Sequence, residues 1–418
     1  MTPVRRRTRH TQHAQHTWIA ALAFAAWAAV IGYRIDTKLM VSAEQSAEHW
    51  TMCDFQETLY YPAVAWLHGV NPYDPAFPDR YPVERRLPAY APMGVLLHLP
   101  LALLPVKPAE AAYFFVTLAL VLALAALTLR ACGLPHDTAW VMALGTLMLI
   151  ARPGHKSMLL GQSTMELALG VYLALIYSRD RPLLAAIGVA LSTLKPQFGL
   201  PLLPLLLVTG AYRAVFGGLG LAIGLSLLVL ARFGVAGPVS WWRSLLHTAA
   251  VVSRPSGMWF LRIDLSYAVR VLVGPHGSVV DLALALGTVA VAAFVVHRTC
   301  RQGPIVASAL ASTATCAAIL LSNYHLTYDA IILTLPIVAL LSGVGVAGVP
   351  RTIRIGLATL LLLPAVHYDL PMIQIFDALG LGAPWHMADA VANTMALTAA
   401  LLGSALVAAR ARPPVSGR

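Results

Sequence analysis

The chain alternates long apolar segments with short polar ones, which predicts a bundle of membrane-spanning helices. The apolar segments run for about 15–25 residues, close to what a helix needs to cross the hydrocarbon core. Backbone amides inside lipid must be hydrogen-bonded within the protein, and the alternation typical of β-barrel strands is absent, so the spans are predicted to be helical. We expect about twelve spans, at 18–34, 108–129, 137–152, 162–178, 182–195, 197–210, 213–232, 278–297, 304–321, 326–342, 352–367 and 387–409.

Two further apolar stretches, at 91–106 and 264–274, are too short or too interrupted by proline to span, so we expect interfacial or re-entrant helices there. The predicted fold is therefore an all-α integral membrane protein. Composition agrees, because 58% of the 418 residues are hydrophobic and only 11% are charged. A soluble protein of this length needs far more charge on its surface.

Positive charge is distributed in a way that predicts topology. The net charge is +11, and the arginines fall in small clusters between predicted spans. With an even number of spans, these clusters and both termini lie on the cytoplasmic side, as the positive-inside rule favours. Nucleic-acid binding is not expected, because the basic residues form no single surface.

Two segments on the opposite side, 35–107 and 233–277, are too long for simple turns and indicate that function lies on the outer face. Asp54 lies in the first of them, and carboxylates in a multispan protein usually serve function. Glu57 follows one helical turn later, but two carboxylates are a weak metal signal, so we expect neither a metal nor another cofactor. The candidate substrate-binding residues of this loop are Glu57, Tyr60, Tyr61, Asn71 and Tyr73.

Several basic residues lie on the outer side, against the topological bias. Arg152 and Lys156 separate the third and fourth spans, Lys195 lies in the turn between two apolar helices, and Arg254 and Arg262 lie in the second long loop. Such cations suggest an anionic ligand such as a phosphate at headgroup level. The alternative is that they reach toward lipid phosphates, as flanking basic residues commonly do.

His325 and Asp329 are four residues apart, which places them on one face if a helix has already begun there. A histidine oriented by the aspartate could bind a sugar hydroxyl or a phosphate. Gln162, at the opening of the fourth predicted span, is a further candidate contact with substrate. The simpler interpretation of all three is a set of polar helix caps with satisfied hydrogen bonds.

The chain resembles glycosyltransferase family 87 from about residue 18 to residue 345. The resemblance is carried by Asp54-Phe55, Tyr60-Tyr61, the Gly69-x-Asn71-Pro72-Tyr73-Asp74 element, Tyr90-Ala91-Pro92 leading into Leu99-Pro100-Leu101, Gly161-Gln162, Lys195-Pro196 and the His325/Asp329 segment.

This resemblance implies a membrane glycosyltransferase of the C-type fold that uses a polyprenyl-phosphate sugar, commonly mannose and in some members arabinofuranose. It implies an inverting transfer at the outer face of the cytoplasmic membrane, with Asp54 as the general base. Lys195, with Lys156 or Arg152, would stabilise the departing phosphate. The expected partners are the polyprenyl-phosphate donor, a lipid or glycan acceptor and membrane lipids.

The resulting domain prediction is a basic cytoplasmic N-terminus at 1–17, a catalytic membrane module at 18–345, C-terminal helices at 346–409 and a tail at 410–418. A multispan secondary transporter of a small anionic or sugar substrate is the alternative, since Pro- and Gly-broken helices are typical of that class. Missing repeat symmetry and few carboxylates in the spans disfavour it. A non-catalytic scaffold for envelope assembly is a third interpretation.

Overall fold

The computed structural model describes residues 3–37, 51–83, 90–252, 262–300, 303–367, 378–380 and 383–410. Within these ranges the chain is helical, and β-structure is limited to one isolated bridge between Arg262 and Leu326. Arg254, one of the predicted outer cations, lies outside the described residues.

The helices follow the order of the apolar segments along the chain. The first part comprises α1 (Pro3–Asp36), η2 (Phe55–Tyr60), α2 (Tyr61–Leu67), η3 (Phe77–Asp79), α3 (Met93–Ala102), α4 (Val106–Ala131), α5 (Thr138–Ile150), α6 (Arg152–Leu160), α7 (Thr164–Tyr177) and α8 (Pro182–Ser192). The second part comprises α9 (Pro196–Val208), α10 (Tyr212–Ala231), α11 (Ala236–Val252), α12 (Leu265–Val273), α13 (Ser278–Thr299), η5 (Ile305–Ala307), α14 (Ala309–Ser322), η6 (Thr327–Leu333), α15 (Thr334–Ser342), α16 (Arg351–Val366) and α18 (Ala383–Arg410).

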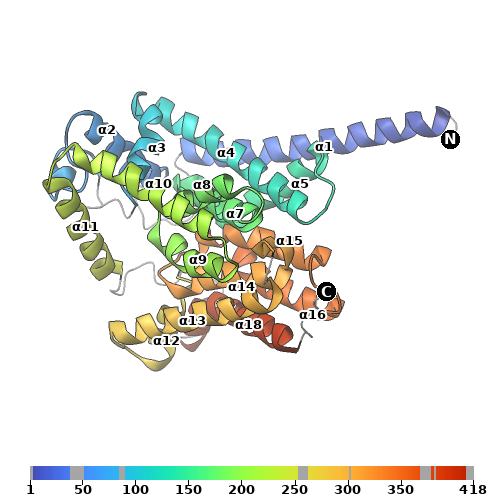
Figure 1. Ribbon diagram of the computed structural model, residues 1–418. Helices are drawn as coiled ribbons and strands as arrows, with labels where there is room; N and C mark the ends of the chain where they lie inside the picture. Colours follow the sequence, from blue (N-terminus) through green and yellow to red (C-terminus); the bar gives the residue numbers. More distant parts are fainter. Residues whose placement is uncertain are drawn as a thin grey trace.

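The helices form one bundle whose two ends differ (Figure 1). Figure 1 marks both chain ends on one side of the bundle, whereas α2 and α11, from the two long predicted outer loops, lie at the opposite end. In the middle of the bundle α7 packs on α8 and α8 packs on α10, while α14 packs between α13 and α18. Placing both chain ends on one side is consistent with an even number of crossings.

Within the described part of the chain, five helices are long and apolar enough to cross a membrane: Gln15–Asp36, Val106–Ala131, Tyr212–Ala231, Ser278–Thr299 and Val391–Arg410. Seven apolar helical segments are shorter, including α3, α5, α8 and the η6–α15 pair. The all-helical prediction is therefore confirmed, while the total of twelve spans stays a prediction. The two stretches expected at the interface are the short helices α3 and α12.

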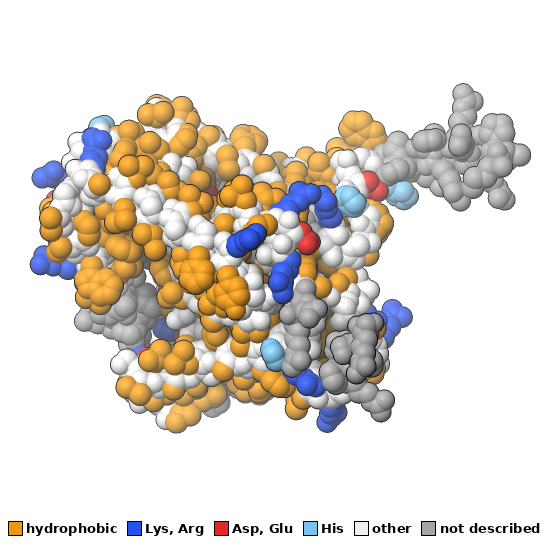
Figure 2. Space-filling view, viewed as in Figure 1, with side chains coloured by type: hydrophobic (Ala, Val, Ile, Leu, Met, Phe, Trp, Pro, Cys, Tyr) orange, Lys and Arg blue, Asp and Glu red, His pale blue; other side chains and the backbone are white. Residues whose placement is uncertain are grey.

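The face of the molecule in Figure 2 is covered mainly by hydrophobic side chains, with Lys and Arg in a few separate groups. On α10, for example, Phe216, Leu227 and Leu228 are all exposed. Exposed apolar side chains over whole helices are the expected surface of a protein whose solvent is lipid.

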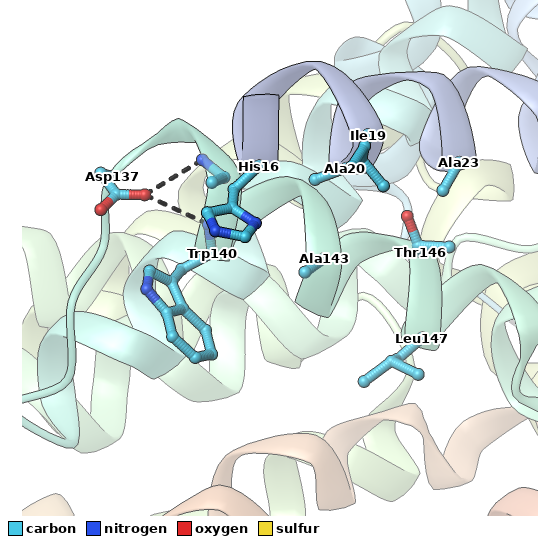
Figure 3. Close-up of a pocket in the computed structure, with 10 residues that line it drawn as sticks. His16, Ile19, Ala20, Ala23, Asp137, Trp140, Ala143, Thr146 and Leu147 are labelled. Carbon is cyan, nitrogen blue, oxygen red and sulfur yellow. Dashed lines mark hydrogen bonds between the residues drawn. The ribbon is translucent and has the colours of Figure 1, made fainter. Parts of the chain in front are cut away.

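An apolar groove of about 850 Å³ runs between α1 and α5. Figure 3 shows Ile19 and Ala20 of α1 opposite Ala143 and Leu147 of α5. Asp137 closes one end and caps α5 by accepting hydrogen bonds from the amides of residues 139 and 140, at 3.1 and 3.3 Å. The groove is lined almost entirely by apolar atoms and lies on the first helix.

Two glycines let α7 and α8 approach each other closely. A Cβ added to Gly170 would lie 2.7 Å from the amide nitrogen of Ser192, and one added to Gly188 would lie 2.6 Å from the carbonyl oxygen of Gly170. Both obstacles are backbone atoms, which cannot rotate away as side chains do. The close pairing of α7 and α8 therefore depends on these two residues, as small residues commonly permit in membrane helices.

Gly188→Ala should lower the stability of the purified protein by about 1–3 kcal/mol, because the added methyl group meets backbone on α7. Gly220→Ala on α10 is the matched control, since a Cβ there meets nothing within 4 Å. The control should leave stability unchanged or raise it by up to about 1 kcal/mol, because alanine favours helix over glycine. Thermal unfolding in detergent, followed by tryptophan fluorescence, measures both; equal melting temperatures would contradict the account.

Candidate active site

Gln162 occupies the centre of a buried polar cluster, and a helix end determines its position. Helix α6 stops at Gly161, which has φ of +67°. The amide of Gln162 donates to the carbonyl of Ser157 at 2.9 Å, the six-to-one bond of a glycine-terminated helix. A Cβ at Gly161 would lie 2.6 Å from the Cβ of Phe55, so glycine is required both for the turn and for the packing.

The segment that begins at Thr51 brings Asp54 next to Gln162. The amide of Met52 donates to the carbonyl of Leu159, at the end of α6, over 2.8 Å. Met52 has φ of +59°, a conformation that non-glycine residues rarely adopt and that concentrates at functional sites. Asp54 then precedes the π-helical turn η2, and its Oδ2 accepts a hydrogen bond from Nε2 of Gln162.

Lys195 approaches Gln162 from the turn between α8 and α9. Its Nζ donates to Oε1 of Gln162 at 3.1 Å and lies 3.7 Å from Oδ1 of Asp329. The same nitrogen lies over the rings of Tyr90 and Tyr328, 5.2 and 5.3 Å from their centroids. Such cation–π contacts add to the stabilisation of a buried ammonium.

Burial alone would lower the pKa of Lys195, but Tyr90, Asp329 and Asp54 outweigh it and raise the pKa above its usual value. Lys195 is therefore a cation throughout the neutral pH range. Burial also raises the pKa of Tyr90, which keeps its hydroxyl protonated so that it donates to Oε1 of Gln162 at 3.0 Å.

His325 and Asp329 form the second half of the cluster. Nδ1 of His325 lies 2.9 Å from Oδ2 of Asp329, and the hydroxyl of Thr164 donates to Oδ1 at 3.3 Å. The expected pairing is present, but its cause differs from the predicted helical face. Helix η6 begins only at Thr327, and Asp329 accepts from the backbone amide of Leu326 at 3.3 Å, so the pair meets across a turn.

The histidine carries a polar atom that has no partner among the described residues. Its Nε2 is buried and unbonded, although Nδ1 is held by Asp329. A buried imidazole nitrogen without a partner is costly unless a ligand completes it. The aspartate orients the ring so that Nε2 can donate to or accept from a substrate oxygen. The cluster thus combines a carboxylate, an ammonium and an oriented imidazole.

Other predicted residues of the first loop hold the site in shape. Glu57 is buried in η2, one turn beyond Asp54. The hydroxyl of Tyr60 donates to the carbonyl of Leu104 at 2.7 Å, and the ring of Tyr61 packs edge-on against that of Tyr60. These contacts join η2 and α2 to the end of α3.

Asn71 and Tyr73 lie in a different place from the cluster, where they attach the loop to α11. The side chain of Asn71 donates to the hydroxyl of Ser240 at 2.6 Å and accepts from the amide of Tyr73 at 3.0 Å. Tyr73 itself is fully buried. The Gly-x-Asn-Pro-Tyr-Asp element therefore attaches the first long loop to α11.

Arg152 and Lys156 lie on α6, the helix that ends two residues before Gln162. Arg152 donates to the carbonyl of His367 at 2.5 Å, and His155 contacts the guanidinium of Arg34. Burial, Arg34 and Lys156 lower the pKa of His155 to about 4, as expected in a basic group. The predicted donor-phosphate cations thus divide into Lys195 in the cluster and a second basic group around α6.

Sequence reasoning did not select Tyr90, Thr164 or Tyr328 as site residues. Tyr90 was noticed only as part of a motif, and Thr164 is one of many hydroxyl residues at helix starts. Their roles follow from contacts across the bundle, with Gln162, Asp329 and Lys195 respectively. Among the described residues, no three or more His, Cys, Asp or Glu side chains gather in a group that could hold a metal ion.

A helical membrane protein with a buried Asp–Gln–Lys–Asp–His cluster has the features of a membrane-embedded enzyme. The model of glycosyltransferase family 87 matches residues 89–323, more than half of the chain. The chain belongs to glycosyltransferase family 87 and is a membrane glycosyltransferase. Neither the curated proteins nor the solved structures include a match to it.

The matched range contains Tyr90, Gln162 and Lys195 but ends before His325 and begins after Asp54. Asp54 and His325, which flank the matched range, are therefore assigned to the site by their contacts with matched residues. Asp54 is hydrogen-bonded to the matched Gln162, and His325 is linked through Asp329 to the matched Lys195.

Gln162→Glu tests whether the bridging amide controls this arrangement. The substitution removes the donor to Asp54 and brings two carboxylates into contact, which then share a proton. We expect glycosyl transfer to fall by at least about tenfold, equivalent to about 1.4 kcal/mol, and the acidic limb of the pH–rate profile to move to higher pH. Gln162→Met, which has no added charge, should lose activity without this shift. An unchanged profile for Gln162→Glu would contradict the bridging role.

Proposed function

We propose that the protein transfers a sugar, mannose in the first instance, from a polyprenyl-phosphate donor to a hydroxyl of a lipid-linked or glycan acceptor. The reaction would take place at the outer face of the cytoplasmic membrane, with inversion at the anomeric carbon. The membrane setting and the family support a lipid-borne donor, and the observation that carries the proposal is the hydrogen-bonded Asp54–Gln162–Lys195 bridge.

In this reaction the acceptor oxygen attacks the anomeric carbon as the bond from that carbon to the phosphate oxygen breaks. The electron pair of the broken bond leaves with polyprenyl phosphate, and the acceptor proton passes to Asp54. General-base assistance of this kind contributes about 10²–10⁴-fold. The proton transfer occurs late, when bond formation has made the acceptor hydroxyl acidic.

Lys195 supplies the complementary charge. Phosphate gains negative charge as it departs, and a buried ammonium already fixed by hydrogen bonds stabilises that charge without reorganisation. His325 adds a second group for an oxygen of phosphate or sugar, because its buried Nε2 has no partner in the described structure. Arg152 and Lys156 contribute at a distance, through the basic group on α6.

Asp54→Asn should reduce kcat by about 10²–10⁴-fold in membranes supplied with labelled polyprenyl-phosphate mannose, because asparagine keeps the shape but cannot accept the proton. Asp79→Asn is the matched control: Asp79 is exposed on the same outer loop, and its substitution should leave the rate unchanged. Equal product from Asp54→Asn and wild type would remove Asp54 as the base.

The donor is tested in the same assay with the wild-type protein. Transfer from polyprenyl-phosphate arabinofuranose but not from the mannose donor would change the sugar and keep the mechanism. Failure with both donors, together with substrate flux into proteoliposomes, would favour the transporter interpretation.

Lys195→Met should lower kcat by about 10²–10³-fold, since the variant loses a charge that acts mainly in the transition state. Lys195→Arg keeps the charge and should retain more activity. Lys107→Met is the control, because Lys107 is an exposed cation at the end of the first long loop.

The raised pKa of Lys195 means that its charge is present below that pKa and is lost only above it. The wild-type rate should therefore show no basic limb from Lys195 up to about pH 9.

A further inference from the structure

A pocket of about 410 Å³ lies beside the polar cluster, between α9, α11, α12, α13 and the end of α14. Its volume falls in the range of roughly 300–1,000 Å³ that is typical of small-molecule sites. One wall is polar and includes Gln197, Arg262, Asp264 and Tyr324. The function described above uses none of these four side chains.

The charges in the pocket compensate one another. Arg262 binds Asp264 through two parallel hydrogen bonds, of 2.8 and 2.9 Å. Arg270 pairs with Asp281 at 2.5 Å. Two arginines and two aspartates sum to zero, so the wall is rich in polar groups without attracting an anion. A phosphate entering here would have to displace a bidentate carboxylate from Arg262.

Two polar side chains of this wall are available to a ligand. Within the described ranges, neither the amide of Gln197 nor the hydroxyl of Tyr324 makes a hydrogen bond, and both residues line the pocket. The Gln197 amide offers a donor and an acceptor, and the phenol offers one of each. An uncharged polyol can use such mixed groups fully, whereas an anion can use only the donors.

The pocket adjoins the segment that carries His325. Asn323 and Tyr324 immediately precede His325, and the amide of Ile263 donates to the carbonyl of His325 at 3.0 Å. Burial raises the pKa of the Tyr324 hydroxyl, and charges from both sides act on it, Arg262 from the pocket and Asp329 from the cluster among them. A ligand held in the pocket therefore lies next to the proposed reaction centre.

The opposite wall is apolar and reaches the lipid-facing surface. Leu200 of α9 and Leu282 of α13 line the pocket and are 62% and 59% exposed on the bundle. Leu245 of α11 and Ala285 of α13 complete this wall. A molecule with a polar head and an alkyl chain can place its head against Arg262–Asp264 and its chain along these leucines.

We propose that this pocket binds the acceptor, and specifically the neutral sugar headgroup of a lipid-borne acceptor whose alkyl chain runs along the apolar wall. This rests on the proposed function, in which the acceptor hydroxyl gives its proton to Asp54. The donor phosphate belongs with Lys195 and His325 instead, where an ammonium and an unpartnered imidazole nitrogen are available.

Octyl α-mannoside is the test acceptor, and a photoreactive analogue with a diazirine on the alkyl chain reports binding without turnover. Ala285→Phe fills the pocket from α13, and Ala283→Phe places the same side chain on the exposed side of that helix, away from the lining residues. Gln197→Ala removes a free polar group from the opposite wall. All are tested in the full-length protein in detergent.

Cross-linked peptides from wild type should map to α9 and α13, and Ala285→Phe should reduce the labelling at least about fivefold while Ala283→Phe leaves it unchanged. In the transfer assay, Ala285→Phe and Gln197→Ala should raise the KM for octyl α-mannoside about tenfold or more, with kcat and the donor KM nearly unchanged.

Three results would overturn the assignment. Labelling outside α9–α13 in wild type places the acceptor elsewhere. Equal effects of Ala285→Phe and Ala283→Phe mean that the pocket is not occupied. A raised KM for the donor with an unchanged KM for octyl α-mannoside makes it a donor-lipid site. If wild type transfers no sugar but cross-linking is specific, the proposed function fails and the sugar-binding pocket stands.

Discussion

A single carboxamide joins the carboxylate and the ammonium to which we assign the proposed chemistry. Gln162 donates from Nε2 to Asp54 and accepts at Oε1 from Lys195 and Tyr90, so the orientation of the amide is determined by its partners. The nitrogen and the oxygen of the amide are both hydrogen-bonded, so the Asp54 carboxylate and the Lys195 ammonium lie close together with the amide between them. A network of this kind is stable only when every member is bonded, since an unpaired group in a low-dielectric interior is costly.

Packing and hydrogen bonds around the end of α6 position this amide. The left-handed Gly161 turns the chain out of α6 directly before Gln162, and Phe55 packs against that turn. The hydroxyl of Tyr113 also donates to the backbone carbonyl of Gln162 at 3.2 Å. Site residues carried on packed helix ends are held more accurately than those on free loops, which electrostatic catalysis requires.

The two long loops both contribute to the site. The first brings Asp54 against α6 and is attached to α11 through Asn71 and Ser240. The second brings Arg262 and Ile263 against the segment that carries His325. The proposed acceptor pocket thus adjoins the segment that carries His325, and its apolar lining reaches exposed leucines of α9 and α13. This arrangement suits two lipid substrates that meet at one membrane surface.

The sequence by itself determined the helices and the class, because the lengths of apolar runs depend only on bilayer thickness and local hydrogen bonding. It also selected Asp54, Gln162, Lys195, His325 and Asp329, since polar residues are rare between apolar segments. Only the tertiary structure decided which of them meet. Lys195 donates to Gln162 while Arg152 donates to the carbonyl of His367, although the linear pattern treats the two cations alike. Contacts between residues more than a hundred positions apart, such as Asp54 with Gln162, arise from packing that no local pattern encodes.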